Sequence, residues 1–171
     1  MRFLLFGLAL YLTTPAQAQL TPPAPKPIIG ARHPALSPDG QRLAFVYRGD
    51  IWLAASKGGR ARPLTFHLEY DAYPVFSPDG HWIAFASKRH GQWDIFVIPA
   101  EGGQARRLTW HSGSEIPFGW SPDGQHIAFG ARRDSPRYCL MSVEVSTYKS
   151  KVLVEDYAAL RYPRWSPDGK T

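Results

Sequence analysis

The tetrapeptide Ser37-Pro38-Asp39-Gly40 decides the fold, because the chain of 171 residues repeats it three more times. From serine to serine the intervals are 40, 44 and 45 residues. Serine can bond the turn backbone, proline presets φ, aspartate tolerates the third position and glycine accepts a left-handed backbone. Each copy, called an SPDG turn below, therefore predicts a hairpin between two antiparallel strands. The sixteen predicted turn residues are Ser37, Pro38, Asp39, Gly40, Ser77, Pro78, Asp79, Gly80, Ser121, Pro122, Asp123, Gly124, Ser166, Pro167, Asp168 and Gly169.

Other features keep the same register around each turn. A bulky apolar residue precedes it, a strand ending in Ala-Phe follows it, and an alternating run such as Asp50-Ile51-Trp52-Leu53 comes next. Glycine pairs at 58–59 and 102–103 predict a second hairpin in the first two units, and the third unit has no such pair. Four short strands in 40 to 45 residues are typical of one blade of a β-propeller.

The sequence thus predicts an all-β fold, a β-propeller of four-stranded antiparallel blades. Blades are expected at 31–66, 67–110 and 111–156, and residues 157–171 begin the next. A closed propeller needs at least about four blades. Three blades and the start of a fourth therefore predict an incomplete propeller, a fragment of a longer protein.

The first 18 residues predict a signal peptide. Arg2 precedes an apolar stretch at 3–12, and Ala16-Gln17-Ala18 offers small residues for cleavage. The stretch is too short for a bilayer, which takes about twenty residues, although an uncleaved anchor is the alternative. A Pro-rich leader follows at 19–30. We expect an exported protein, periplasmic or secreted, with no stable membrane span after cleavage.

Composition narrows the function classes. The net charge is +6, but lysine and arginine are scattered along the chain, so a solvated surface is favoured over a nucleic-acid site. The single cysteine, Cys139, forms neither an internal disulfide nor a metal cluster. No metal and no cofactor are predicted.

The connections opposite the SPDG turns carry the candidate binding residues. Leu-Thr-x-His occurs twice, which places His67 and His111 44 residues apart. For both histidines, a structural role in holding the chain where it crosses between blades is favoured over binding, because no metal-ligand spacing is present. The candidates are His67, Tyr70, Asp71, Arg89, His90, His111 and Glu115. No catalytic residue is predicted: residues 119–123 resemble the start of a nucleophile elbow, but Asp123 stands where glycine is needed.

The repeat resembles that of TolB-type propellers. The likeness rests on the SPDG turn with its Ala-Phe strand, then Asp-Ile-aromatic, Gly-Gly and Arg-x-Leu-Thr, and it covers residues 33–171. Residues 34–52, then 64–71 and 74–89, are more similar still to the first blades of secreted tricorn-type proteases. Residues 137–150 depart from the pattern, because they lack the Gly-Gly turn. The resemblance therefore does not define the outer edge of the third blade.

The resemblance implies a role at the start of a larger enzyme. Tricorn-type proteases have two propellers, a PDZ domain and a C-terminal serine-protease domain, and their propellers are thought to filter or guide peptides. By that likeness this chain is a non-catalytic propeller with peptides or proteins as partners. A TolB-like periplasmic interaction module and the propeller cap of a prolyl-oligopeptidase-like hydrolase remain alternatives. The domain that follows residue 171 would distinguish them; the oligomeric state is left open.

Overall fold

The computed structural model describes residues 24, 26–133, 138–156 and 163–169, so the predicted signal peptide lies outside the described part. The described residues form β-strands and no helix, and among them no helix could cross a membrane. The strands are β1 (Arg32–Leu36), β2 (Arg42–Tyr47), β3 (Asp50–Ala55), β4 (Arg62–Pro63), β5 (Asp71–Phe76), β6 (Trp82–His90), β7 (Gln92–Pro99), β8 (Arg106–Arg107), β9 (Glu115–Trp120), β10 (His126–Ala131), β11 (Tyr138–Glu144) and β12 (Ser150–Asp156).

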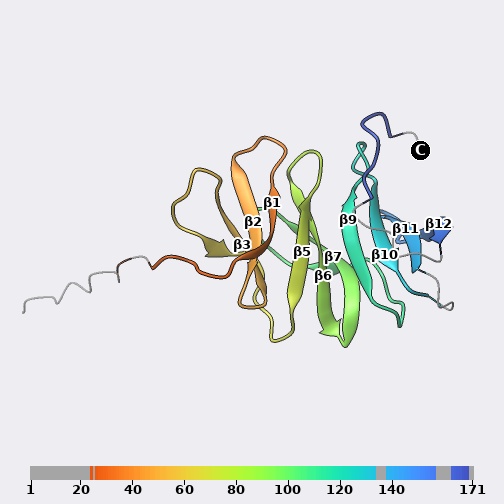
Figure 1. The fold of residues 1–171 in the computed structure, drawn as a ribbon, viewed down its shortest axis with the longest axis horizontal. Coiled ribbons are helices and arrows are strands. Elements are labelled where there is room, and N and C mark those ends of the chain that lie inside the picture. Colours follow the sequence, from red (N-terminus) through yellow and green to blue (C-terminus); the bar gives the residue numbers. More distant parts are fainter. Residues whose placement is uncertain (1–23, 25, 134–137, 157–162, 170–171) are drawn as a thin grey trace, which may run out of the picture.

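These strands form three four-stranded antiparallel sheets in the orders β1-β2-β3-β4, β5-β6-β7-β8 and β9-β10-β11-β12. The sheets stand side by side in chain order (Figure 1). This confirms the predicted all-β fold, an incomplete propeller of four-stranded blades. We call the three sheets blades 1, 2 and 3.

Each SPDG turn links the first and second strands of a blade through one hydrogen-bond pattern. The glycine N–H donates to the serine carbonyl at 2.8–2.9 Å in all four copies. In the first three copies the serine Oγ also accepts, at 2.9 Å, from the N–H of the residue five positions on. The four glycines have φ of +69° to +70°, in the left-handed region that disfavours a side chain.

Successive SPDG turns also pack on one another. A Cβ added at Gly80 would lie 3.7 Å from Cδ of Pro38, and one at Gly124 would lie 3.8 Å from Cδ of Pro78. Gly169 stands in the same relation to Pro122, at 3.7 Å. The turns therefore follow one another along one edge of the molecule, which we call the turn face, and it is the upper edge in Figure 1.

The core lies between the blades. One cluster joins residues of blades 1 and 2, with Ile51, Ile83 and Phe85 fully buried. A second joins blades 2 and 3, with Ile95 and Phe129 fully buried. Because side chains alternate along a strand, each middle strand faces one neighbouring blade with every second residue. Neighbouring blades therefore depend on each other for their hydrophobic core.

Two local features differ from expectation. Arg89 and His90, expected in a connection opposite the SPDG turns, are the end of β6, and only Gly91 separates this strand from β7. The outer strand of blade 3 was not defined by the sequence, because a glycine pair is missing there. This strand, β12, is seven residues long, whereas β4 and β8 have two each. The Glu144 carboxylate holds the turn of this hairpin, because it accepts hydrogen bonds from the hydroxyls of Ser146 and Thr147.

Candidate functional site

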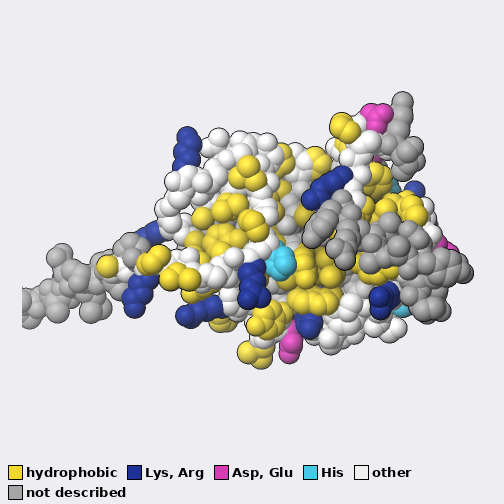
Figure 2. All heavy atoms as spheres, in the orientation of Figure 1, with side chains coloured by type: hydrophobic (Ala, Val, Ile, Leu, Met, Phe, Trp, Pro, Cys, Tyr) yellow, Lys and Arg dark blue, Asp and Glu magenta, His cyan; other side chains and the backbone are white. Residues whose placement is uncertain are grey.

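The candidate residues gather on the edge opposite the SPDG turns, which we call the loop face. It consists of the connections between second and third strands and of the crossings between blades at 64–70 and 108–114, and it is the lower edge in Figure 1. On this face Figure 2 shows hydrophobic side chains over the lower parts of β5 and the β6–β7 hairpin, with lysine and arginine beside them.

The two repeated histidines hold the crossings between blades. Nδ1 of His67 accepts a hydrogen bond from the N–H of Glu69 at 3.0 Å, and Nδ1 of His111 accepts one from Gly113 at 2.9 Å. The carbonyl of His111 also accepts a bond from the Gln92 side chain at 3.0 Å. These hydrogen bonds support the structural role that the sequence favoured for both histidines.

Four charged residues on the loop face form two equivalent ion pairs. Arg89 lies 2.7 Å from Asp71, and Arg133 lies 2.6 Å from Glu115. Both carboxylates are fully buried, while the arginine side chains are 17% and 26% exposed. Each pair ties the start of the first strand to the end of the second strand in its blade, so Asp71 and Glu115 do not face solvent. The sequence did not single out Arg133, although it stands 44 residues after Arg89.

Tyr70 and His90, the two remaining candidates, each contact a different neighbour. The ring of Tyr70 covers Gly49, where an added Cβ would lie 3.5 Å from it, and the side chain is 60% exposed. The ring of His90 stacks on Phe96 with centroids 6.1 Å apart. The seven predicted residues thus share one face but form no single pocket among the described cavities, and no metal-binding cluster occurs in the described residues.

Asp94 and Asp50 are two further carboxylates in equivalent positions that the sequence did not single out. Asp94 is fully buried at the start of β7, 2.9 Å from Arg107, and burial raises its pKa although Arg107 opposes the effect. Asp50 is its equivalent in blade 1. Burial raises the pKa of Asp50, and hydrogen bonds from the His67 N–H and from Thr65 oppose this increase. The repeated Asp-Ile dipeptide could have indicated these two carboxylates. Its spacing, however, is also expected of any residue that recurs in equivalent strands.

The aspartates of the SPDG turns are structural. Hydrogen bonds from the serine hydroxyl and then from a backbone N–H lower the pKa of Asp39, Asp79 and Asp123. A general base near neutral pH needs a pKa close to the working pH. These carboxylates are tuned in the opposite direction, which supports their assignment to the turns.

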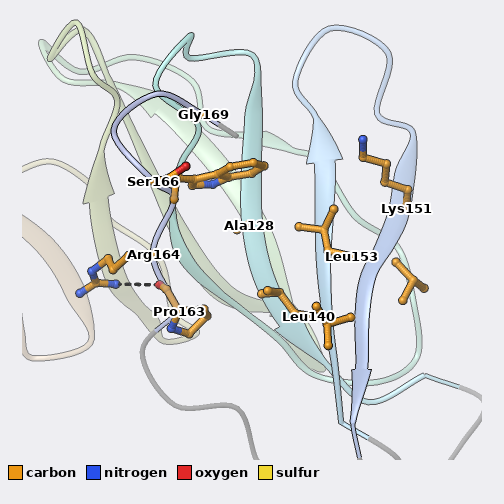
Figure 3. A pocket seen from close by; sticks show the side chains of 11 residues that line it. Ala128, Leu140, Lys151, Leu153, Pro163, Arg164, Ser166 and Gly169 are labelled. Atoms are coloured by element: carbon orange, nitrogen blue, oxygen red, sulfur yellow. Dashed lines mark hydrogen bonds between the residues drawn. The ribbon is translucent and has the colours of Figure 1, made fainter. Parts of the chain in front are cut away.

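A hollow lies away from the loop-face residues, between blade 3 and the segment 163–169. It measures about 730 Å³, and Leu140 and Leu153 point across it toward that segment (Figure 3). Ala128 and Leu140 occupy the places that Ala84 and Ile95 have in blade 2, by the strand register. Ala84 and Ile95 pack against the next blade. This groove therefore has the apolar character of a face that packs against a neighbouring blade.

The sequence matches the family described as the tricorn protease N-terminal beta propeller domain over residues 30–171. The chain belongs to this family. A tricorn protease homolog of Streptomyces coelicolor is 48% identical over 34% of this chain and 5% of its own length. The crystal structure of the tricorn protease matches 72% of this chain and 13% of its own, with a TM-score of 0.63 and 26% identity.

A TolB-type protein is also similar. The structure from Agrobacterium tumefaciens matches 82% of this chain and 56% of its own, with a TM-score of 0.71 and 26% identity. The chain spans little more than half of this protein and far less of the tricorn relatives. The predicted likeness to TolB-type and tricorn-type propellers is confirmed.

Proposed function

We propose that this chain is the N-terminal propeller of an exported tricorn-like peptidase, and that its loop face binds peptides or proteins and guides them toward the protease. The observation that carries the proposal is an exposed apolar segment in the first crossing. Phe66, Leu68 and Tyr70 are 94%, 100% and 60% exposed. Side chains of this kind gathered on one surface typically mark an interaction site.

The other candidate residues take supporting roles in this proposal. His67 fixes the crossing that carries the apolar segment, and the Asp71–Arg89 pair anchors the strand that follows it. Glu115 with Arg133, and His111, do the same in the next blade. His90 stays exposed at the end of β6. No catalytic residue is assigned to these 171 residues.

Binding of fluorescein-labelled peptides from a tryptic digest of casein tests the role of the loop face. We expect the full-length variant Phe66→Ser/Leu68→Ser to lose most of the anisotropy change. Leu36→Ser is the matched control, because Leu36 is 57% exposed at the end of β1 that leads into the SPDG turn. Equal binding by the wild type and the loop variant would contradict the proposal.

Export is the second part of the proposal, and it rests on the charge and apolar pattern of residues 1–18. N-terminal sequencing of the protein from its host should give Gln19 as the first residue. Ala18→Lys should block cleavage, because signal peptidase requires a small residue there. A mature protein that begins at Met1 would refute the assignment.

A TolB-like interaction module is the second candidate, favoured by the TM-score of 0.71 to a TolB-type structure. In that case the full-length protein binds its partner through the propeller without peptidase activity. Labelling with a fluorophosphonate probe, which reacts with active serine hydrolases, separates the two. A labelled full-length protein favours the peptidase, and an unlabelled one favours the TolB-like module.

A further inference from the structure

The three blades carry a cation at one equivalent position of the loop face. Arg48, Lys88 and Arg132 follow the same point of the second strand at intervals of 40 and 44 residues, as the SPDG turns do. Within the described part of the chain none of the three forms an ion pair with a carboxylate. Arg89 and Arg133, which come directly after two of them, do form such pairs. The unpaired cations therefore have a different role from their neighbours.

Two of these cations, Arg48 and Lys88, lie close to an aromatic ring of their own blade. The guanidinium of Arg48 is 5.3 Å from the ring centre of Tyr47, and Nζ of Lys88 is 5.0 Å from that of Trp93. In blade 3 the charge of Arg132 acts on the Tyr138 hydroxyl, lowering its pKa against the larger raising effect of burial. A cation beside a ring offers a carboxylate partner and a flat apolar surface at the same point.

The inner strands add rings to the same face. Tyr73 of β5 lies 4.2 Å from the ring of His33 in β1 and 6.0 Å from the ring of Trp93. His33 and Tyr73 have φ of +50° and +56°, and each sits at a register shift between the first and second strands of its blade. Bulges of this kind re-aim side chains and are frequent beside binding sites.

Among the described residues no carboxylate of this face forms an ion pair with the three cations, and its buried acids have other partners. Asp71, Asp94 and Glu115 are fully buried, and each lies 2.6–2.9 Å from its own arginine. Their charge is thus already balanced. The surface left over is the set Arg48, Tyr73, Lys88, Trp93, Arg132 and Tyr138, which we call the cation–aromatic rim.

We infer that the cation–aromatic rim binds extended peptides that carry acidic side chains. Carboxylates of the peptide would pair with one cation per blade, and neighbouring side chains would lie on the rings. The inference rests on the proposed function, since it names the kind of peptide that the loop face takes. A single-stranded nucleic acid could also use cations and rings. The aliphatic side chain of Leu68, fully exposed in the adjoining crossing, favours a peptide because it gives bases no ring to stack on.

The test measures anisotropy of fluorescein-labelled 12-residue probes with the full-length protein. The probes are a Glu-rich peptide containing tyrosine, the same peptide with Gln for Glu, the same with Lys for Glu, and oligothymidylate. We expect the Glu peptide to bind about tenfold more tightly than the Gln peptide, with the advantage shrinking in 0.3 M salt. The triple variant Arg48→Gln/Lys88→Gln/Arg132→Gln should bind both peptides equally.

Two further variants keep the result interpretable. Lys57→Gln/Arg60→Gln/Lys149→Gln removes the same charge from exposed residues of the turn-face hairpins and should leave the preference intact. Arg48→Lys/Arg132→Lys keeps the charge and should bind the Glu peptide within about twofold of the wild type. Circular dichroism checks that each variant is folded.

Several results would overturn the inference. Equal affinity for the Glu and Gln peptides removes the acidic preference while leaving peptide binding, and so the proposed function, in place. Failure to bind any peptide sinks the proposed function itself. Oligothymidylate binding as tight as the Glu peptide makes the rim a general polyanion site. If the turn-face variant loses the preference for the Glu peptide as fully as the triple rim variant does, net charge alone explains the preference.

Discussion

The Asp71 carboxylate and the Arg89 guanidinium lie 2.7 Å apart, and 44 residues later Glu115 and Arg133 repeat the pair at 2.6 Å. Both acids are completely buried at the start of an inner strand. Blade 1 has no such pair, because the repeat register places Ala31 and Gly49 at these positions. The ring of Tyr70 covers Gly49 instead. The loop face thus combines buried, neutralised charge in blades 2 and 3 with an aromatic contact in blade 1.

Breaking the ion pair in blade 2 should destabilise the protein. Arg89→Met leaves the buried Asp71 without its partner, which typically costs about 3 kcal/mol or more in the free energy of unfolding. Arg62→Met is the control, since Arg62 is 49% exposed and lies 3.9 Å from Glu101, and we expect a change below about 1 kcal/mol. Urea unfolding of the full-length protein measures both. Similar losses in the two variants would show that burial of the acid does not matter.

The double variant Asp71→Asn/Arg89→Met separates repulsion from packing. Removing both charges eliminates the uncompensated carboxylate. The double variant should therefore lose less free energy of unfolding than the two single variants lose together. Strict additivity of the two single changes would contradict a direct interaction between the side chains.

Glycine in the second SPDG turn should be less replaceable than glycine in the third. Gly80→Ala strains a residue with φ of +70° and also brings a Cβ within 3.1 Å of the Arg42 guanidinium, which donates to the Gly80 carbonyl. Gly124→Ala meets only Cδ of Pro78, at 3.8 Å. We expect a loss of about 1 kcal/mol for Gly124→Ala, from backbone strain alone, and a larger loss for Gly80→Ala. Thermal unfolding measures the difference, and equal losses would exclude a role for Arg42.

The SPDG aspartates should make stability depend on pH in the acid range. Hydrogen bonds from Ser77 and from His81 N–H lower the pKa of Asp79 below its ordinary 3.8. The ionised carboxylate therefore stabilises the fold above pH ~4, and this contribution is lost as the pH falls through the lowered pKa.

Melting curves from pH 6 to pH 3 test this dependence. The difference in melting temperature between the wild type and Asp79→Asn should shrink below pH ~4. Glu69→Gln is the control, because its exposed side chain forms no ion pair among the described residues, and its curve should run parallel to the wild type. A constant difference for Asp79→Asn across the range would rule out the carboxylate as the cause.

The sequence predicted the fold well because one turn chemistry recurs in it. Serine, proline, aspartate and glycine each have a local reason to occupy their place in the turn, so four copies define the hairpins without knowledge of the tertiary structure. The long outer strand of blade 3 was not predictable in this way. Its turn depends on hydroxyls of Ser146 and Thr147 reaching back to Glu144, and this combination has no counterpart in the other blades.

The candidate site was predicted only as a face. Loop positions followed from strand order, but burial did not, so Asp71 and Glu115 were grouped with exposed residues although both are buried in ion pairs. The cation–aromatic rim was missed because its partners come from different strands. Trp93 and Tyr138, which lie near the starts of the equivalent strands β7 and β11, are 45 residues apart, whereas Lys88 and Arg132 are 44 apart.

Gly130 makes room for two rings on the loop face and should not tolerate a side chain. A Cβ at this position would overlap the hydroxyl of Tyr138 and lie 2.8 Å from the ring of Phe118. Its φ is not positive, and the equivalent residue of blade 2 is Ala86, so the backbone itself accepts alanine. Gly130→Ala should therefore cost about 1–3 kcal/mol through overpacking. Tyr138→Phe in the same chain removes the overlapping oxygen and should restore part of the loss.

Gly119→Ala in β9 is the matched control for this overpacking. No atom lies within 4 Å of its added Cβ and its φ is not positive, so the substitution should be neutral or slightly stabilising. Urea unfolding of the four variants, with Gly130→Ala/Tyr138→Phe as the fourth, gives the comparison. A loss for Gly130→Ala that Tyr138→Phe does not reduce would mean that Phe118 alone limits the space, and an equal loss for Gly119→Ala would trace the effect to the strand backbone instead of the rings.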